Sequence, residues 1–329
     1  MNRWLGPSLR RHLLMILAGT AVTITLVPTI GSSYALAFGF QFVIWTALAL
    51  SWSLFSGNSG YASFGHGVFF GIGTYAASAV FRSTDAPFVV ALAVAGLAAG
   101  ALALLLGAAV FSSPRFAGDL FGLVTLAMAF IAVTVVSNVA FLDGGTGVFV
   151  REHTSSTWIG SDSRHLFVVG ALLAALSAVV ALGASTTRWG AALRSIHDDE
   201  AVAESLGVPT YRYKVVTFAV SGTLAGLAGA PQAVFLGYVE VGAVFTLNIP
   251  LLVIMMTILG GMARWYGPLV GAAVVVILRE ALTGWASAEM AQIIMGLSLI
   301  VVIAVMPRGV SGYLTRTRPA ARAGQGGAR

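Results

Sequence analysis

Residues 88–111 read FVVALAVAGLAAGALALLLGAAVF, a run of apolar and small residues without a charged side chain. As a helix rising 1.5 Å per residue, this run would be about 36 Å long, enough to cross the ~30 Å hydrocarbon core of a bilayer. Comparable runs recur along the chain, which is 58% hydrophobic and only 9% charged. Helices are expected because a backbone in lipid must satisfy its own hydrogen bonds, and continuous rather than alternating runs disfavour a β-barrel. The sequence therefore predicts an all-α, polytopic membrane protein.

Ten membrane-spanning helices are predicted. Their approximate ranges are 13–30, 35–56, 68–84, 88–111, 119–142, 166–184, 215–237, 249–263, 268–284 and 290–306. If the N-terminus is cytoplasmic, fourteen of the 18 Lys and Arg residues fall on the cytoplasmic side and four on the outer side. This bias is the one that the positive-inside rule describes. An even number of spans also keeps the basic C-terminal segment inside, so both termini are expected to be cytoplasmic.

Three regions are expected along the chain. Residues 1–12 form a cytoplasmic N-terminal segment, residues 13–306 the transmembrane domain, and residues 307–329 a basic, disordered tail. The transmembrane domain contains one long polar cytoplasmic insert at about 185–214. The N-terminus imitates a signal peptide, but the run 13–30 is longer than a usual signal core, so an uncleaved first helix is favoured.

Several classes of function are excluded or disfavoured by what the sequence lacks. There is no cysteine, no GxxxxGK[ST] phosphate loop, and no HExxH or GxSxG motif. We therefore expect no catalytic residues, no metal site and no cofactor bound by this chain. The net charge of +6 comes from residues that flank spans, which orientation explains better than a nucleic-acid partner does. Few ionisable groups lie within the spans, which argues against an ion-coupled carrier.

A glycine-rich stretch, residues 56–75, carries more information than the apolar runs. Six glycines between residues 56 and 75 disfavour a regular helix throughout, so a broken helix or re-entrant turn beside a path is predicted. The alternative is that Gly67 and Gly71, spaced as GxxxG, let two helices pack closely. The candidate path residues here are Gly57, Asn58, Gly60, Ser63, Gly65 and His66. For His66, a hydrogen-bonded structural role is favoured over a proton relay.

Further candidates lie in two outer segments and one charged pair. The turn after the fifth span could face the substrate or simply reverse the chain. Its candidate path residues are Gly144, Gly145, Thr146 and Gly147, and Asn248 at the start of the eighth span is added to them. Arg279 and Glu280 lie towards the outer end of the ninth span. Charges within a span are functional candidates, although pairing or reaching the interface is the favoured explanation here.

The cytoplasmic insert has the composition of a surface knob. Residues 189–209 are too polar for lipid, and Gly207 and Pro209 are helix-stop signals for one or two short helices. An apolar edge and an acidic edge are expected, which suit a groove on a soluble partner; a solvated linker is the alternative. The candidate coupling residues are Arg194, Asp198, Asp199, Glu200, Glu204 and Gly207.

Taken together, these segments resemble a known family. The run Gly60 to Tyr75 is similar to the signature of LivM-type permeases, the membrane subunits of ABC importers for branched-chain amino acids. Five further similar elements follow in the same order. They begin at Gly118, Gly144, Ala192, Ala225 and Leu259, and the resemblance covers most of residues 45–285.

The resemblance implies a bacterial inner-membrane permease that works with other subunits. These are two cytoplasmic ABC ATPases that bind ATP–Mg, a second permease of the LivH type or a self-copy, and an extracytoplasmic solute-binding protein. It also implies that the stretch from about Arg194 to Gly207 docks on an ATPase. Arg264 and Asp143 depart from the family pattern, which leaves urea or short amides open as substrates. An ion-coupled secondary transporter remains the alternative from another class.

Overall fold

The computed structural model describes most of the chain. The described residues are 7–29, 32–84, 86–113, 118–139, 146–150, 163–262, 264–284, 290, 293–294, 296–298 and 300–301. The predicted tenth span lies mostly outside them, and the predicted tail at 307–329 lies wholly outside them.

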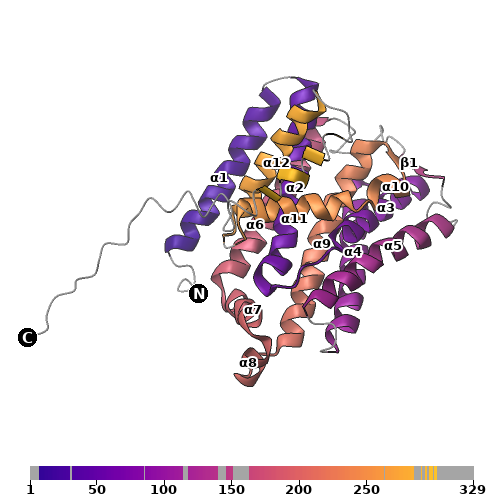
Figure 1. The fold of residues 1–329 in the computed structure, drawn as a ribbon. Coiled ribbons are helices and arrows are strands. Elements are labelled where there is room, and N and C mark those ends of the chain that lie inside the picture. The colour runs from indigo at the N-terminus through magenta and orange to yellow at the C-terminus, as the bar shows by residue number, and fades with distance from the viewer. Residues whose placement is uncertain are drawn as a thin grey trace, which may run out of the picture.

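The described chain is built almost entirely of helices (Figure 1). The long ones are α1 (Pro7–Thr29), α2 (Ser33–Trp52), α3 (His66–Ser83), α4 (Phe88–Phe111), α5 (Asp119–Asn138), α6 (Ser163–Thr186), α9 (Thr210–Leu236), α11 (Asn248–Gly260) and α12 (Gly267–Thr283). The short ones are a π-helical turn η1 (Ser53–Gly57), α7 (Arg188–Asp198), α8 (Glu200–Ser205) and α10 (Val241–Val244). Two-residue strands β1 (Val148–Phe149) and β2 (Tyr238–Val239) pair in antiparallel fashion, a small addition to the predicted all-α fold.

Seven helical segments among the described residues are long and apolar enough to cross a membrane. They are Leu9–Leu26, Ser33–Gly57, Phe88–Phe111, Leu120–Asn138, Ser163–Thr186, Thr210–Leu236 and Val241–Gly260. Each overlaps a predicted span, and the predicted span 88–111 coincides with α4. The predicted spans 68–84 and 268–284 are the helices α3 and α12, which do not meet the same length and hydropathy criteria.

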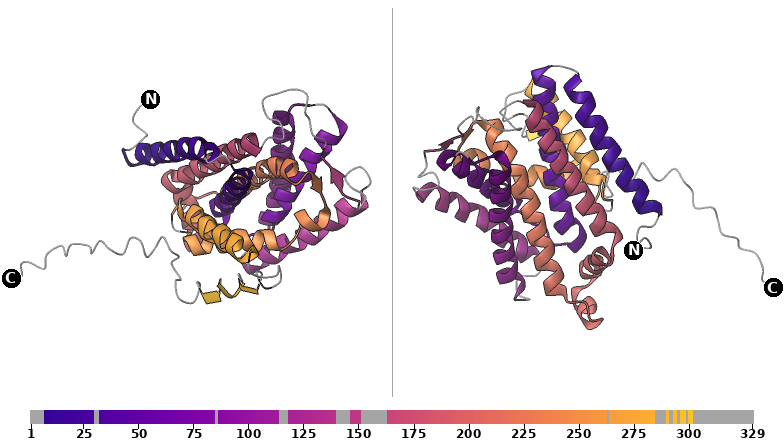
Figure 2. Two further views of the ribbon diagram at one scale, coloured as in Figure 1. Left: turned by 90° about the horizontal axis from the view of Figure 1, so that it is seen from above. Right: turned by 180° about the vertical axis from the view of Figure 1, so that it is seen from behind.

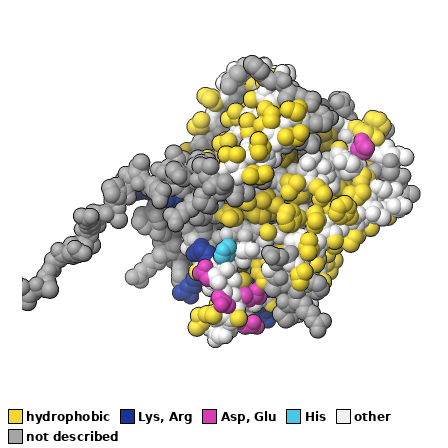
Figure 3. Space-filling view, in the orientation of Figure 1, with side chains coloured by type: hydrophobic (Ala, Val, Ile, Leu, Met, Phe, Trp, Pro, Cys, Tyr) yellow, Lys and Arg dark blue, Asp and Glu magenta, His cyan; other side chains and the backbone are white. Residues whose placement is uncertain are grey.

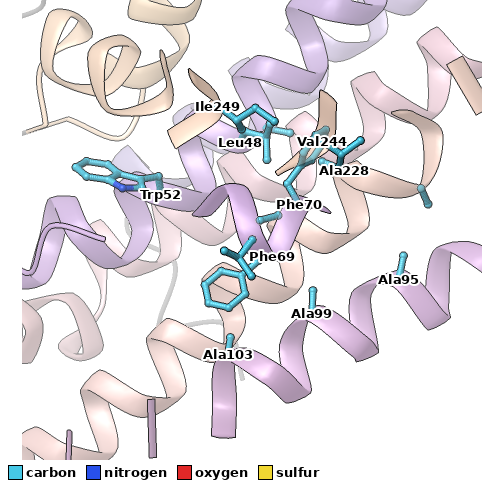
Figure 4. Packing of buried hydrophobic residues seen from close by; sticks show 14 of the residues in the cluster. Leu48, Trp52, Phe69, Phe70, Ala95, Ala99, Ala103, Ala228, Val244 and Ile249 are labelled. Atoms are coloured by element: carbon cyan, nitrogen blue, oxygen red, sulfur yellow. The ribbon is translucent and has the colours of Figure 1, made fainter. Parts of the chain in front are cut away.

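The core of the molecule forms where small residues let helices approach closely. α9 packs against α3 and α4, α2 packs against α6, and α11 packs against α12. Ala95, Ala99 and Ala103, one turn apart on α4, lie on the same side of that helix (Figure 4). A Cβ on Gly226 of α9 would lie 2.3 Å from the Cβ of Ala99. These residues bring α4 and α9 together because side chains at i and i+4 share a helix face.

Polar and apolar surfaces are separated in space. Charged side chains gather at the end of the molecule formed by α7 and α8, and hydrophobic side chains cover the body above it (Figure 3). Two further views place α7 and α8 at that end and α1 at the periphery beside α6 (Figure 2). Exposed apolar side chains on α1, such as Leu14 and Leu17, suit contact with lipid.

Candidate functional site

The glycine-rich stretch breaks the helix between residues 60 and 65. α2 runs into η1, residues 60–65 are not helical, and α3 begins at His66. Asn58 Nδ2 donates to the carbonyl oxygens of Ser53 and Leu54, each at 3.1 Å. These bonds satisfy carbonyl groups that lose regular helical partners near a helix end. The predicted break is therefore present, and Asn58 supports it.

Residues within the break pack into the protein. The carbonyl oxygen of buried Ser63 accepts a hydrogen bond from Trp52 Nε1 at 2.7 Å. His66 is 1% exposed, and its Nε2 lies 3.2 Å from Ser221 Oγ, which donates to the carbonyl oxygen of Ser51 at 2.6 Å. Since that hydroxyl has one hydrogen, His66 Nε2 must be the donor to Ser221. This geometry fits the structural role favoured for His66.

Glycines around the break allow close contact with other elements. A Cβ on Gly65 would lie 3.3 Å from the Cβ of Thr125, and one on Gly57 would lie 2.9 Å from Ser53 Oγ. Gly71 has no room for a side chain, because its Cβ would lie 2.4 Å from the ring of Phe245. Gly60 has φ +78°, and its Cβ would lie 2.7 Å from His197 Nδ1 on α7. The break therefore lies directly against the insert predicted to bind a partner.

One polar cluster joins the insert to the break. Lys214, the single lysine of the sequence, forms an ion pair with Glu200 at the start of α8, and Tyr61 Oη donates to the other carboxylate oxygen of Glu200. The Lys214 side chain is 8% exposed, and its Nζ lies 5.0 Å from the ring centroids of Tyr61 and Phe111. These cation–π contacts and the ion pair hold α8, α9 and the break together. We call these three residues, Tyr61, Glu200 and Lys214, the junction cluster.

The junction cluster shifts two pKa values. Partial burial raises the pKa of Tyr61, and the hydrogen bond to the Glu200 carboxylate raises it further. Burial would by itself raise the pKa of Glu200, but hydrogen bonds from Lys214 and Tyr61 outweigh it and lower that pKa. Glu200 is therefore held as a carboxylate at neutral pH.

Acid should weaken the junction cluster. The pKa of folded Glu200 lies below its ordinary value of 4.5, so the ionised carboxylate stabilises the fold fully at neutral pH. That contribution is lost as the pH falls from about 4.5 through the folded pKa. We expect the wild type to melt at a higher temperature than Glu200→Gln near neutral pH, and the difference to close in acid. Melting curves of the purified protein in detergent, recorded across this range, would contradict the prediction if the difference persisted unchanged.

The insert places its predicted coupling residues in different environments. Asp199 Oδ1 accepts from the backbone N–H of Val202 at 3.0 Å and caps α8. Gly207 has φ +85° and ends α8, with its N–H donating to the Glu204 carbonyl oxygen at 2.9 Å. Arg194 donates to the carbonyl oxygen of Ser185 at 3.2 Å. The acidic edge expected from the sequence is thus divided, since Glu200 turns inward while the other acidic residues of the insert are more exposed.

The expected apolar edge of the insert is also divided. Of the expected edge, Ile196 and Ala203 are buried against the protein, whereas Leu206 is 79% exposed. Val202, which is not part of that expected edge, is 54% exposed. Val202 and Leu206 stand one turn apart, so they lie on one face. Asp198 and Glu204 are exposed on the same small knob. We call Asp198, Val202, Glu204 and Leu206 the knob surface.

The glycine turn after the fifth predicted span is only partly described. Gly144 and Gly145 lie outside the described residues. The carbonyl oxygen of Thr146 accepts from Tyr238 Oη at 2.8 Å. Gly147 has φ +76°, and its Cβ would lie 2.2 Å from that hydroxyl, so a side chain there would displace Tyr238. Together with the β1–β2 pair, these contacts attach the turn to the end of α9.

A cavity of about 540 Å³ lies between α2, α9, α11 and α12. Its lining on α9 comes from the last turns of that helix, so the cavity lies in the half of the molecule away from α8. Of the described path candidates, Asn248 lines it. Its other polar lining side chains are Tyr34, Gln41, Trp45, Gln232, Thr246, Arg279 and Glu280. The path assignment of the glycines around the break stays a prediction.

The comparison with known families decides what kind of protein this is. The profile described as "Branched-chain amino acid transport system / permease component" matches residues 34–303, well over half of the chain. The chain belongs to this family. The match includes the helix break, the junction cluster, the knob surface and the cavity.

Curated relatives of this permease carry the same description. It is 26% identical over 312 residues to the high-affinity branched-chain amino acid transport system permease protein LivM of Escherichia coli K12, covering 87% of this chain and 71% of that protein. The LivM protein of Salmonella typhimurium is also 26% identical, over 302 residues. The LivH protein of Escherichia coli K12 is 24% identical over 308 residues, covering 92% of its length. No solved structure matches the chain.

Sequence reasoning missed most of the cavity in this permease. Gln41, Trp45 and Gln232 carry no motif that distinguishes them from the other residues of their predicted spans. The sequence identifies Arg279 and Glu280 as charges within a span, but it favours pairing or contact with the interface as their explanation. The signal that could have found the site is the presence of polar side chains in spans of otherwise apolar sequence.

Proposed function

We propose that this permease forms part of the passage of an ATP-driven importer for branched-chain amino acids in the bacterial inner membrane. The family match over residues 34–303 carries the proposal. LivM and LivH are both named as permease proteins of one transport system, and the chain is similar to both. A second permease of the LivH type, or a self-copy, would supply the rest of the passage. An extracytoplasmic solute-binding protein would deliver the solute.

The orientation that we propose has ten spans and both termini in the cytoplasm. It adds α3, α12 and a helix near 290–306 to the seven segments that qualify as spans. Four cations lie on α7 and at the start of α9, which supports this orientation because cytoplasmic segments of membrane proteins are rich in Arg and Lys; they are Arg188, Arg194, Arg212 and Lys214. The cavity between α2 and α12 then opens in the outer half of the bilayer.

The knob surface is the docking site that we propose for a cytoplasmic ATPase. It presents two apolar side chains, Val202 and Leu206, flanked by acidic ones at the polar end of the molecule. A small apolar centre with a charged rim is typical of protein interfaces. ATP–Mg would bind the ATPases, not this chain, which has no phosphate loop.

Movement of the knob would reach the helix break through the junction cluster. Glu200 begins α8, Lys214 lies on α9, and Tyr61 lies in the break, so a displacement of α8 pulls on both partners. Glu200 and Tyr61 are 139 residues apart in sequence, which makes this a direct mechanical connection between distant segments. Rocking of packed helices about such contacts is a common way to change access.

Charging the knob surface should separate the permease from its ATPase. The variant Val202→Asp/Leu206→Asp places two carboxylates where apolar side chains would be buried, so we expect uptake of L-leucine in proteoliposomes to fall about ten-fold or more. The ATPase subunits should no longer co-purify with the permease. Both side chains are exposed, so the melting temperature should stay close to that of the wild type.

Phe149→Asp is the matched control for this experiment. Phe149 is 75% exposed and lies on β1, away from α8, so co-purification with the ATPase should persist. Full co-purification and uptake in the double variant would place the docking site elsewhere. ATP-independent uptake by the purified chain under an ion gradient would instead support a secondary transporter and overturn the proposed function.

A further inference from the structure

The cavity between α2, α9, α11 and α12 has opposite charges on one wall. Arg279 and Glu280 are consecutive on α12, and both line it. Consecutive side chains leave a helix about 100° apart, and because both of these border the cavity, it is offered a cation and an anion. Both side chains are exposed in the single chain, and charges within a predicted membrane span are candidates for a function.

Both charges are held by aromatic side chains of α2. The guanidinium of Arg279 lies over the ring of Trp45, with 5.9 Å to the centroid, and Trp45 Nε1 donates to Gln41 Oε1 at 3.1 Å. Glu280 Oε1 accepts from the hydroxyl of Tyr34. These contacts join α12 to α2 and fix where the two charges point, which is what preorganised recognition requires.

The remaining wall is apolar. It is lined by Ile44, Leu48, Phe70, Phe235, Ile249 and Leu252. Figure 4 shows Leu48, Phe70, Val244 and Ile249 gathered in one region of the core, where α2, α3, α10 and α11 meet. Transfer of a branched aliphatic side chain from water to this apolar wall would be favourable.

One buried acceptor in the lining has no partner. Gln232 Oε1 is inaccessible to solvent and has no hydrogen-bond partner among the described residues. That oxygen has no surface open to the cavity, so it is not assigned to the ligand. A second hollow of about 390 Å³ shares Tyr34, Phe38 and Glu280 with the cavity, so it lies beside the charged wall.

From this arrangement we propose that the cavity binds a zwitterionic amino acid directly. Arg279 binds its carboxylate, Glu280 binds its ammonium, and the apolar wall holds its side chain. The inference rests on the proposed function and adds that the permease itself, not only the solute-binding protein, selects the solute. Neutral solutes such as urea or short amides would make no use of the charge pair.

The test measures which charged group of the ligand, the carboxylate or the ammonium, each of the two residues binds. The permease is purified in complex with its partner permease and ATPases, without solute-binding protein, and binding of radiolabelled L-leucine is measured. The competitors are 3-methylbutylamine, which lacks the carboxylate, and 4-methylpentanoate, which lacks the ammonium. We expect the wild type to prefer leucine about ten-fold or more over each, because each analogue lacks one charged hydrogen-bond partner.

Each variant should lose one preference and keep the other. Arg279→Gln should bind leucine no better than the amine while still preferring leucine to the acid, and Glu280→Gln should show the reverse. Arg82→Gln, on the exposed end of α3, is the control and should keep both preferences. Equal weakening of all three ligands by both variants, or no change in either, would overturn the proposal.

The outcome also separates this inference from the proposed function. Absence of leucine binding to the wild-type complex, together with ATP-driven leucine uptake when solute-binding protein is added, would overturn the inference alone. Absence of ATP-driven uptake of any branched-chain amino acid by the complete system would overturn the proposed function.

Discussion

Lys214→Met is expected to lower the free energy of unfolding by about 3 kcal/mol, because it leaves the carboxylate of Glu200 without its buried cation. The value is at the lower end for a broken buried pair, since the Glu200 side chain keeps 29% of its surface exposed. The apparent melting temperature in detergent should fall by several degrees. Leucine uptake should fall as well, because α8 loses its attachment to α9 and to the break.

A second variant separates the loss of the pair from the loss of the lysine. Lys214→Met/Glu200→Gln removes both charges and keeps an acceptor for the Tyr61 hydroxyl, so most of the melting temperature should return. Arg212→Met removes a cation that is exposed two residues earlier on α9 and should change the melting temperature little. A double variant as unstable as Lys214→Met would show that the lysine stabilises the fold in another way.

Gly271→Ala is the second substitution with a large expected effect. A Cβ at Gly271 would lie 1.7 Å from the carbonyl oxygen of Met256, so α12 must move away from α11. Overpacking of this kind costs about 3 kcal/mol. Because α12 carries Arg279 and Glu280, the shift should also abolish leucine binding. Melting temperature and radioligand binding would be measured on the same preparation.

Gly183→Ala, in helix α6, is the matched control. Nothing lies within 4 Å of a Cβ at Gly183, and alanine favours a helix over glycine by about 1 kcal/mol. The same chemical change should therefore leave the melting temperature equal or slightly higher, with leucine binding intact. Similar losses from both glycines would mean that helix contact at Gly271 is not the cause.

Local features of the fold could be predicted well. The span at 88–111 coincides with α4, and the break falls within the glycine-rich stretch. The insert contains two short helices, α7 and α8, and α8 ends just before Gly207. Each rests on a property of the residues themselves. Apolar length sets a span, and glycine supplies the φ of +85° that stops α8.

Contacts between distant residues could not be predicted. The sequence predicts Glu200 on the acidic edge of the insert, yet it binds Tyr61, which is 139 residues earlier. Tyr34 and Glu280 are 246 residues apart and meet at the cavity. In a helix of a soluble protein the polar face is exposed, so the sequence shows that the opposite face is buried. In a bilayer both the lipid and the protein core are apolar, so the sequence of a membrane helix gives no such signal.

The sequence by itself determined that this chain crosses a membrane as helices, where one helix breaks and which polar insert projects, because hydrophobic length and glycine content act locally. Only the tertiary structure decided that the insert is tied to the break through Lys214 and that a charged wall faces an apolar one beside α12. The physical reason is that the lipid-facing and core-facing sides of a membrane helix are both apolar. The sequence therefore does not show which side packs inward, and packing selects which polar side chains meet.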